Sequence, residues 1–242
     1  VTQKTERVEQ PGHWFYQSGR LNFNTYKTGE TNADFLFMYN KEVSKVGVSV
    51  NAGGNYRMNT YEQQGVSGEN FKIPTKPIVE SASILSPSYT PTQTKKVTSL
   101  YASAEFSYDN FVYLNLSARN DWASTVEQQN RSLLYPGASI AFTPTSIDGF
   151  GSNDGLGYLK IRAGYGTSAR FPGPYNTRAV LAATANTFVR PGGLATTVNS
   201  LPTTRANREL KPELQEEFEL GLEAEFFKKR LTLDATVYKR DI

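Results

Sequence analysis

The feature that most restricts the fold of this chain is a strict alternation of apolar and polar residues. Residues 217–226 read EFELGLEAEF, in which every second position is Phe, Leu or Ala and the positions between are Glu or Gly. A helix would spread these apolar side chains around its axis, because successive helical residues are turned by about 100°. A strand places all of them on one face. The pattern predicts a two-faced strand, although Glu is a poor strand former.

The same alternation recurs along much of the chain and predicts about nine strands. The clearest segments besides 217–226 are 100–108, 112–119, 159–166 and 231–238, and the weaker ones are 14–25, 33–40, 43–52 and 134–143. Many have close to the ~9–11 residues that a tilted strand needs to cross a bilayer. Tight connections at 108–111 and 227–230 predict antiparallel hairpins at 99–119 and 217–238.

Connection lengths carry a second signal. A further tight connection is expected at 40–43, whereas 53–94 and 167–214 are expected to be long loops and 120–133 an intermediate one. Short turns at one end and long loops at the other are typical of outer-membrane barrels, with the turns in the periplasm and the loops outside the cell. The connection 144–157 is the exception, since it is of medium length on the short-turn side. We therefore expect an all-β, antiparallel meander that forms part of a large transmembrane outer-membrane β-barrel. The alternative is a soluble, secreted β-sandwich that binds carbohydrate, because sandwich strands alternate too.

Composition agrees with one wet and one apolar face. Only 38% of residues are hydrophobic, yet 12% are aromatic, with 14 Tyr and 14 Phe, and Tyr is favoured where lipid meets water. No stretch approaches the ~18 consecutive apolar residues of a transmembrane helix. A formal charge of +3 argues against nucleic acid as a partner. The first residues, VTQKTERVEQ, lack the apolar core of a signal peptide, so we expect both ends to lie inside a longer chain.

The residue types in this sequence give little support for a catalytic or a metal-binding site. The chain has one histidine, His13, and no cysteine, so a multi-His or thiolate site cannot be built within it. The alternating Glu residues of 217–225 would be ~6–7 Å apart, as paired catalytic carboxylates require, but a solvated wall explains them more simply. Residues 148–157 resemble a calcium loop without its final Glu and are interpreted as a turn. We expect no enzyme, no cofactor and no metal.

Several strings together resemble a known family. They are GGNYRMNTY at 53–61, SLYASAEFSYDNFVYLNLSARNDWAST at 99–125, NRSLLYPGASIAF at 130–142, YLKIRAGYGTSA at 158–169, NRELKPELQEEFELGLEAEFF at 207–227 and RLTLDATVY at 230–238. Their order and spacing are similar to those of the barrel of SusC/RagA-like TonB-dependent transporters of Bacteroidota. The most specific elements are RNDW at 119–122, the YP of Tyr135 and Pro136, and LKPE at 210–213.

The resemblance implies a function that belongs to a longer protein. Members of the family are barrels of about 22 strands with an N-terminal plug, and they import glycans, peptides or other nutrients through the outer membrane. A SusD-like lipoprotein covers the barrel, and TonB, driven by ExbB and ExbD, acts on an N-terminal box. Residues 1–242 show neither plug nor TonB box, so they are expected to be a partial barrel.

The expected strands assign residues to the two faces. Leu114, Leu116, Leu220 and Leu222 should meet lipid. The candidates for the lumen are Asn115, Arg119, Glu219, Glu223 and Asp234. In the long loops, the aromatic candidates for contact with substrate or lipoprotein are chiefly Tyr56, Tyr61, Phe171 and Tyr175, with Phe71, Tyr89 and Phe188 in the same class. For any one of these rings, packing within the loop is the simpler interpretation.

Overall fold

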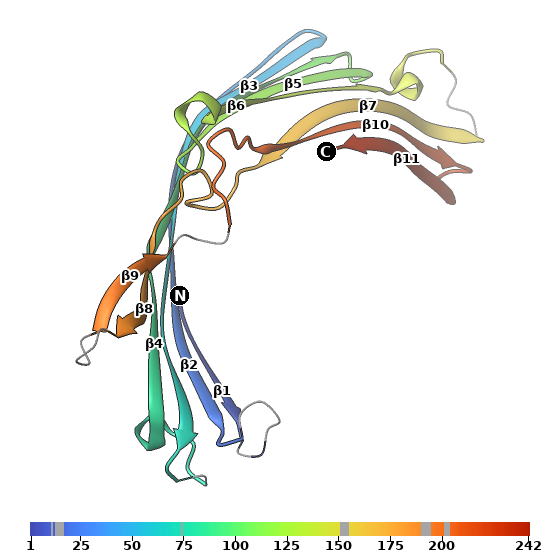
Figure 1. Cartoon of the computed structure of the whole chain (residues 1–242). Coiled ribbons are helices and arrows are strands. Elements are labelled where there is room, and N and C mark those ends of the chain that lie inside the picture. Colours follow the sequence, from blue (N-terminus) through green and yellow to red (C-terminus); the bar gives the residue numbers. More distant parts are fainter. Residues whose placement is uncertain (11, 13–16, 74, 151–154, 190–194, 201–203) are drawn as a thin grey trace. The chain divides into compact units, whose positions relative to one another are not determined.

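The computed structural model describes the 242-residue chain except residues 11, 13–16, 74, 151–154, 190–194 and 201–203, and the side chains of 91 and 182–200. The one histidine, His13, therefore lies outside the described residues. Within the described part, nine strands form one antiparallel sheet in the order β1-β2-β3-β4-β5-β6-β7-β10-β11, and β8 and β9 form a separate hairpin (Figure 1). The predicted all-β meander is confirmed.

The strands differ greatly in length. The sheet strands are β1 (Thr2–Glu9), β2 (Arg20–Val43), β3 (Val46–Phe71), β4 (Ala82–Tyr108), β5 (Val112–Ala123), β6 (Ser132–Phe142), β7 (Leu156–Arg170), β10 (Glu213–Phe226) and β11 (Leu231–Asp241), and the hairpin strands are β8 (Ala182–Val189) and β9 (Ala195–Ser200). Where the structure is described, three short 3-10 helices lie at Val79–Ser81, Gln128–Asn130 and Pro144–Ser146. Among the described residues, no helix has the length and apolar character needed to cross a membrane.

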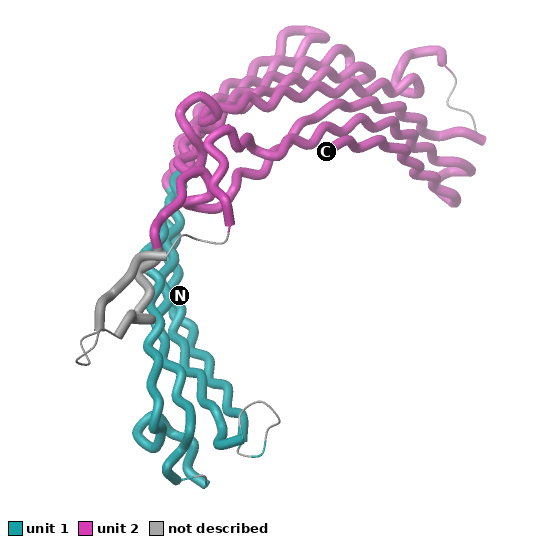
Figure 2. The backbone as a smooth tube through the Cα atoms, viewed as in Figure 1, with its two compact units in different colours: residues 1–32, 57–96 teal, residues 33–56, 97–242 magenta. Residues whose placement is uncertain are grey.

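The chain divides into two compact units (Figure 2). Unit 1 comprises Val1–Asn32 and Arg57–Lys96, and unit 2 comprises Ala33–Tyr56 and Val97–Ile242, so β2, β3 and β4 contribute residues to both. Unit 1 has a small core of Leu21, Phe71 and Ala82. Apart from this core and Gly68, the described strand residues of unit 1 are exposed or half-buried, and unit 2 holds the remaining strands.

The tight turns have the backbone geometry that hairpins require. Asp109 and Asn110 have φ of 46° and 59°, and the Phe111 amide donates to the Tyr108 carbonyl at 3.1 Å. Two successive positive φ angles match the right-handed twist of the flanking strands, and Asp and Asn tolerate this region better than most residues. Between β10 and β11, three successive residues have positive φ, namely Phe227, Lys228 and Lys229 at 53°, 57° and 67°. The hairpins predicted at 99–119 and 217–238 are confirmed.

Several predicted boundaries are wrong. Segments 14–25 and 33–40 were expected as separate strands, but β2 is continuous from Arg20 to Val43, and the tight turn follows at Ser44 rather than at 40–43. The predicted loop at 53–94 is mostly strand, since β3 runs to Phe71 and β4 begins at Ala82. The predicted loop at 167–214 shrinks to 171–212 and contains β8 and β9. Strand β1 was missed.

These errors share a physical cause. Alternation reveals a strand only where one face is apolar, and the missed strand segments carry polar residues on both faces. Residues 57–70, for example, read RMNTYEQQGVSGEN. Gly, Ser, Thr and Asn are also the residues that mark loops, so composition pointed in the wrong direction there.

Candidate functional site

Strands β7, β10 and β11 have two chemically distinct faces, and the register fixes which residues share each. Leu220 lies opposite Ala163 of β7 and Val237 of β11, and Leu222 lies opposite Ile161 and Ala235. One residue along, Glu223 lies opposite Lys160 and Asp234, and Glu219 opposite Gly164 and Tyr238. Directly opposed residues of an antiparallel pair point to the same side of the sheet. The apolar and polar sets predicted from alternation are therefore separated as expected.

An arginine joins the two acidic candidates of this polar face. Glu223 and Asp234 are direct cross-strand neighbours, a like-charge arrangement that is unfavourable by itself. The Arg162 guanidinium donates to Glu223, to Asp234 Oδ1 at 3.4 Å and to Thr236 Oγ1 at 2.7 Å. Gly221 makes room for it, because a Cβ there would lie 2.7 Å from Arg162 Cγ. One cation thus holds β7, β10 and β11 together on the polar side.

The remaining glutamates of the 217–225 series are mostly paired. Glu217 bonds the Arg240 guanidinium of β11, with 2.6 Å between Nε and Oε2, and Glu225 lies 3.5 Å from Lys229 Nζ. Lys160 Nζ is 3.6 Å from Glu223 Oε1. The carboxylates that were expected as a solvated row therefore also form ion pairs, with basic residues of β7, β11 and the β10–β11 turn. Glu219 lines an adjoining hollow with Gly164, Ser168 and Arg240.

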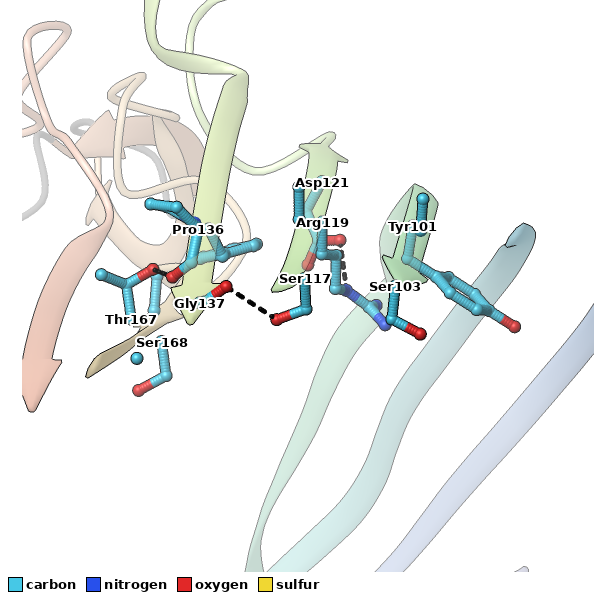
Figure 3. Close-up of a pocket in the computed structure, with 14 residues that line it drawn as sticks. Tyr101, Ser103, Ser117, Arg119, Asp121, Pro136, Gly137, Thr167 and Ser168 are labelled. Atoms are coloured by element: carbon cyan, nitrogen blue, oxygen red, sulfur yellow. Dashed lines mark hydrogen bonds and ion pairs between the residues drawn. The ribbon is translucent and has the colours of Figure 1, made fainter. Parts of the chain in front are cut away.

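The RNDW element forms a second polar cluster on β4, β5 and β6. The Arg119 guanidinium donates to Asp121 Oδ1 at 2.7 Å and to Ser99 Oγ at 2.8 Å, and it lies 6.0 Å from the centre of the Tyr101 ring. Figure 3 shows the Arg119–Asp121 pair beside Tyr101. Arg119 and Tyr135 are opposed across β5 and β6. The alternating residues Ser99, Tyr101, Arg119 and Asp121 therefore occupy one face.

An open hollow of about 510 Å³ lies beside this cluster. Small residues form its floor, because Ser103, Ser117, Gly137 and Gly166 follow one another across β4, β5, β6 and β7. Two of its hydroxyls bond backbone carbonyls, Ser117 to Gly137 at 3.5 Å and Thr167 to Pro136 at 2.9 Å (Figure 3). The full lining is Tyr101, Ala102, Ser103, Ser117, Ala118, Arg119, Asp121, Tyr135, Pro136, Gly137, Gly166, Thr167, Ser168 and Ala169. This hollow presents hydroxyl groups, the two aromatic rings of Tyr101 and Tyr135, and the internally neutralised Arg119–Asp121 pair.

The aromatic loop candidates separate into different environments. Tyr56 and Tyr61 lie on β3, not in a loop. A Cβ at Gly54 would meet Phe35 and Leu100, so Tyr56, two residues further, shares the apolar face with them. Tyr61 packs beside Tyr26, with ring centres 6.5 Å apart, and its hydroxyl donates to Gln63 at 3.1 Å. Of the lesser candidates, Phe71 is buried, Tyr89 is exposed on β4, and the Phe188 side chain lies outside the described residues.

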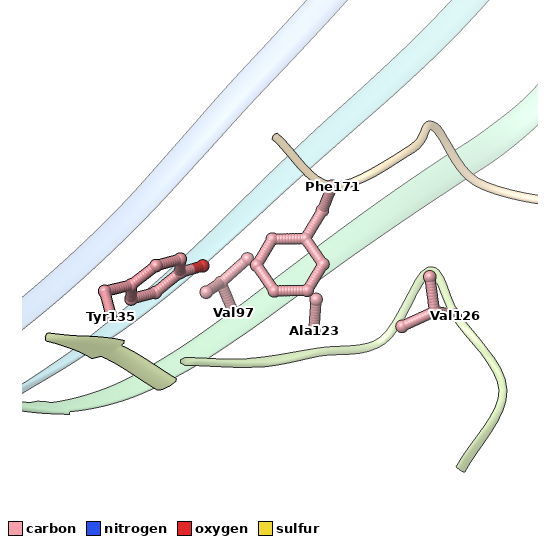
Figure 4. Close-up of a cluster of buried hydrophobic side chains, with 5 residues drawn as sticks. All are labelled: Val97, Ala123, Val126, Tyr135 and Phe171. Atoms are coloured by element: carbon pink, nitrogen blue, oxygen red, sulfur yellow. The ribbon is translucent and has the colours of Figure 1, made fainter. Parts of the chain in front are cut away.

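Phe171 and Tyr175 do lie in the connection after β7. Phe171 is buried with Val97, Ala123, Val126 and Tyr135, in the largest apolar cluster of unit 2 (Figure 4). Its ring is committed to packing and is withdrawn from any ligand. Tyr175 is 57% exposed and has a φ of 65°, so it remains a candidate for contact.

The sequence did not single out some residues that organise the polar face. Arg162 was recognisable as polar-facing from its alternation with Ile161 and Ala163, but its three partners come from strands distant in sequence. Tyr135, known only as part of the YP element, lines the hollow and packs on Phe171. No cluster of three or more potential metal ligands of the His, Cys, Asp and Glu types occurs among the described residues.

Residues 3–242 match the family described as TonB dependent receptor-like, beta-barrel. The chain belongs to this family, whose members are transporters and receptors of the outer membrane rather than enzymes. TonB-dependent receptor P3 of Formosa agariphila is 24% identical over 225 residues, covering 91% of this chain and 22% of that relative. The predicted TonB-dependent receptor barrel is thereby confirmed.

Solved structures agree on the fold. A structure of the RagAB peptide transporter superposes with a TM-score of 0.82 at 21% identity, covering 99% of this chain and 26% of the other. Its "open-open" state gives a TM-score of 0.77 at 20% identity, with the same coverages. The chain spans about a quarter of the length of the relatives it matches. The sandwich alternative is wrong, because the described strands β1–β7, β10 and β11 form one continuous sheet rather than two facing sheets.

Proposed function

We propose that this chain is a section of the wall of an outer-membrane importer whose transport is driven through TonB, ExbB and ExbD. The observation that carries the proposal is the match of residues 3–242 to the receptor barrel family, combined with a sheet of two chemically distinct faces. In this proposal, the polar face with Asn115, Arg119, Glu219, Glu223 and Asp234 lines the lumen. The face with Leu220 and Leu222 contacts lipid.

The size of the apolar face supports this orientation. Strand β5 runs from Val112 to Trp122 across it, a rise of ~35 Å at ~3.4 Å per residue, or ~25 Å of bilayer at a tilt of ~45°. Aromatic residues lie at both ends of this stretch of the apolar face. Phe111 makes edge contacts with Tyr108 and Phe142 at 5.4 and 6.3 Å, and Trp122 and Tyr56 are 36% exposed at the other end. Such aromatic girdles sit at the two interfaces of barrel membrane proteins.

The same proposal assigns the ends of the strands. The turns at Asp109 and Lys229 face the periplasm, whereas the connections 124–131 and 171–212 face the outside, with the β8–β9 hairpin in the latter. Strands β2, β3 and β4 are longer than a bilayer needs, and the excess length is the part of each strand in unit 1. These parts are largely polar, as expected of strands that extend into water. A SusD-like lipoprotein acting as a lid is the partner we propose for these outer segments, with Tyr61 and Tyr175 as candidate contacts.

The proposed cargo is a nutrient of the glycan or oligopeptide class. The hollow beside Arg119 offers hydroxyls and the Tyr101 ring, which suit sugar hydroxyls and peptide groups alike. Support for peptides comes from the fold shared with a transporter that is named for peptides. Because the Arg119 charge is neutralised by Asp121, the hollow favours an uncharged portion of the cargo.

Uptake of labelled oligopeptides and oligosaccharides by bacteria that carry the full-length receptor tests the proposal. Deleting 182–200 should reduce uptake or lipoprotein association while the barrel still inserts, as judged by heat-modifiable mobility on gels. The control is the point substitution Lys229→Ala in the β10–β11 turn, which is proposed to face the periplasm. This variant should transport normally. Full uptake after deletion would remove the hairpin from the mechanism. Absence of TonB-dependent uptake of any offered nutrient by the unaltered receptor would refute import itself.

A further inference from the structure

Two of the sequence elements that carry the family resemblance meet in space. They are NRS at 130–132, which leads into β6, and LKPE at 210–213, which leads into β10. The Asn130 side-chain amide donates to the carbonyls of Glu209 and Leu210, each at 3.2 Å. An amide reaching two successive carbonyls holds the backbone without depending on the side chains there. Asn130 therefore fixes the segment through which the chain re-enters the sheet.

The segment that leaves the sheet after β7 is held from the same connection. Arg178 donates from Nε and Nη2 to the two carboxylate oxygens of Glu127 at 2.8 and 3.0 Å. This is the bidentate geometry that distinguishes an ordered arginine–carboxylate pair from a loose surface contact. Thr177 beside it is buried, and Phe171 packs into the cluster containing Val126.

The two segments also touch each other. The Asn207 backbone N–H donates to the Asn176 backbone carbonyl at 3.0 Å. Residues 171–178 and 207–212, which we name the stems, are thus joined to each other and to residues 124–131, which we name the bracket. Between the stems lie β8 and β9.

We propose that the bracket is a positioning element that fastens both stems of the 171–212 connection to the barrel rim, with Glu127 and Asn130 as its positioning residues. The functional part of this inference rests on the proposed function, in which the connection contacts cargo or lipoprotein. A connection of 42 residues that were free at both stems would lose much ordering entropy on each capture event. A connection whose stems are fastened in advance presents its contact residues in a defined place, which lowers that entropic loss. The meeting of NRS and LKPE is then explained by one hydrogen-bonded joint.

Distance measurements on the full-length receptor test the inference. Spin labels at Thr204→Cys, just before the returning stem 207–212, and at Lys229→Cys, in a turn, report the position of that stem by double electron–electron resonance in nanodiscs. The unaltered bracket should give one narrow distance peak. Arg178→Glu should lose this peak because it opposes Glu127, and Asn130→Asp should lose it because an acceptor replaces the donor at the Glu209 and Leu210 carbonyls. The exchanged pair Glu127→Arg with Arg178→Glu should regain the narrow peak.

Arg205→Glu is the matched control, since it makes the same charge change on the same connection at an exposed residue. It should leave the narrow peak intact. Unchanged peaks in both Arg178→Glu and Asn130→Asp would overturn the bracket, as would equal broadening by Arg205→Glu. Failure of the proposed function would look different. The unaltered receptor would then show the narrow peak yet transport nothing.

Discussion

The two compact units of the chain differ in how apolar and polar residues are distributed over the faces of their strands. In unit 2, the residues of β5 alternate cleanly, with Leu114 and Leu116 on one face and Asn115 and Ser117 on the other. In unit 1, the residues of β3 are polar on both faces, as Thr60, Glu62 and Gln64 alternate with Asn59, Tyr61 and Gln63. A strand therefore does not need an apolar face in order to form; it needs partners on its edges. Alternation shows that the two faces of a strand meet different surroundings. In the orientation proposed above, the lipid boundary lies near Tyr56 and Val97.

The largest expected effect is an all-or-none difference in labelling of intact cells. A cysteine in the β8–β9 hairpin, Thr196→Cys, should react with an impermeant maleimide, because the connection 171–212 is proposed to lie outside the cell. A cysteine in the turn, Lys229→Cys, should not react unless the outer membrane is permeabilised. Labelling at Lys229 alone would invert the proposed orientation of both units.

A charged residue in place of an apolar one should change the free energy of unfolding by different amounts in the two units. Leu222→Arg should destabilise the full-length barrel in lipid vesicles by roughly 2–4 kcal/mol, because Leu222 lies beside Ile161 and Ala235 on the face proposed to contact lipid. Ile84→Arg, at a 48% exposed apolar residue of unit 1, should change the stability by less than ~1 kcal/mol if unit 1 is in water.

Glu219→Arg is the control on the opposite face of β10 and should be tolerated better than Leu222→Arg. We prefer Glu219 to Glu223 for this purpose, because Glu223 is already held by Arg162 and Lys160. Urea unfolding in vesicles measures all three variants. Equal losses for Leu222→Arg and Ile84→Arg would remove the distinction between the units.

A smaller loss is expected from breaking the ion-pair network inside unit 2. Arg162→Leu should destabilise the barrel by about 1–3 kcal/mol, because Glu223 and Asp234 would then oppose each other with only Lys160 nearby. Arg170→Leu, an exposed arginine at the end of the same strand, is the control and should lie within ~0.5 kcal/mol of the parent. The same urea assay decides. A matching loss in both variants would mean that the charge itself, rather than the network, matters.

The sequence predicted what period-two alternation can encode and little beyond it. It identified the hairpins around Asp109 and Lys229 and the faces of Glu219 and Leu220, because each depends on neighbours in one or two strands. It missed β1 and the length of β3, where both faces are polar. Partners such as Arg162 with Thr236, or Asn130 with Leu210, are separated by 74 and 80 residues. Such contacts depend on the strand order and register of the whole sheet, which no local pattern contains.

The smallest expected effect is a response to acid. It distinguishes the proposed Glu127–Arg178 fastening from the other surface charges of unit 2. The Arg178 hydrogen bonds lower the pKa of Glu127 to about 2, with smaller contributions from Thr177 and Arg208. A lowered pKa means that the fastening is fully present above the usual carboxyl pKa and is lost as pH falls toward about 2. A spin label at Thr204→Cys on the full-length receptor should gain mobility over that range of pH. In Glu127→Gln, the label should be mobile already at pH 7 and should respond little to acid. Identical titrations of the parent and Glu127→Gln would show that the Glu127–Arg178 pair does not hold the stem.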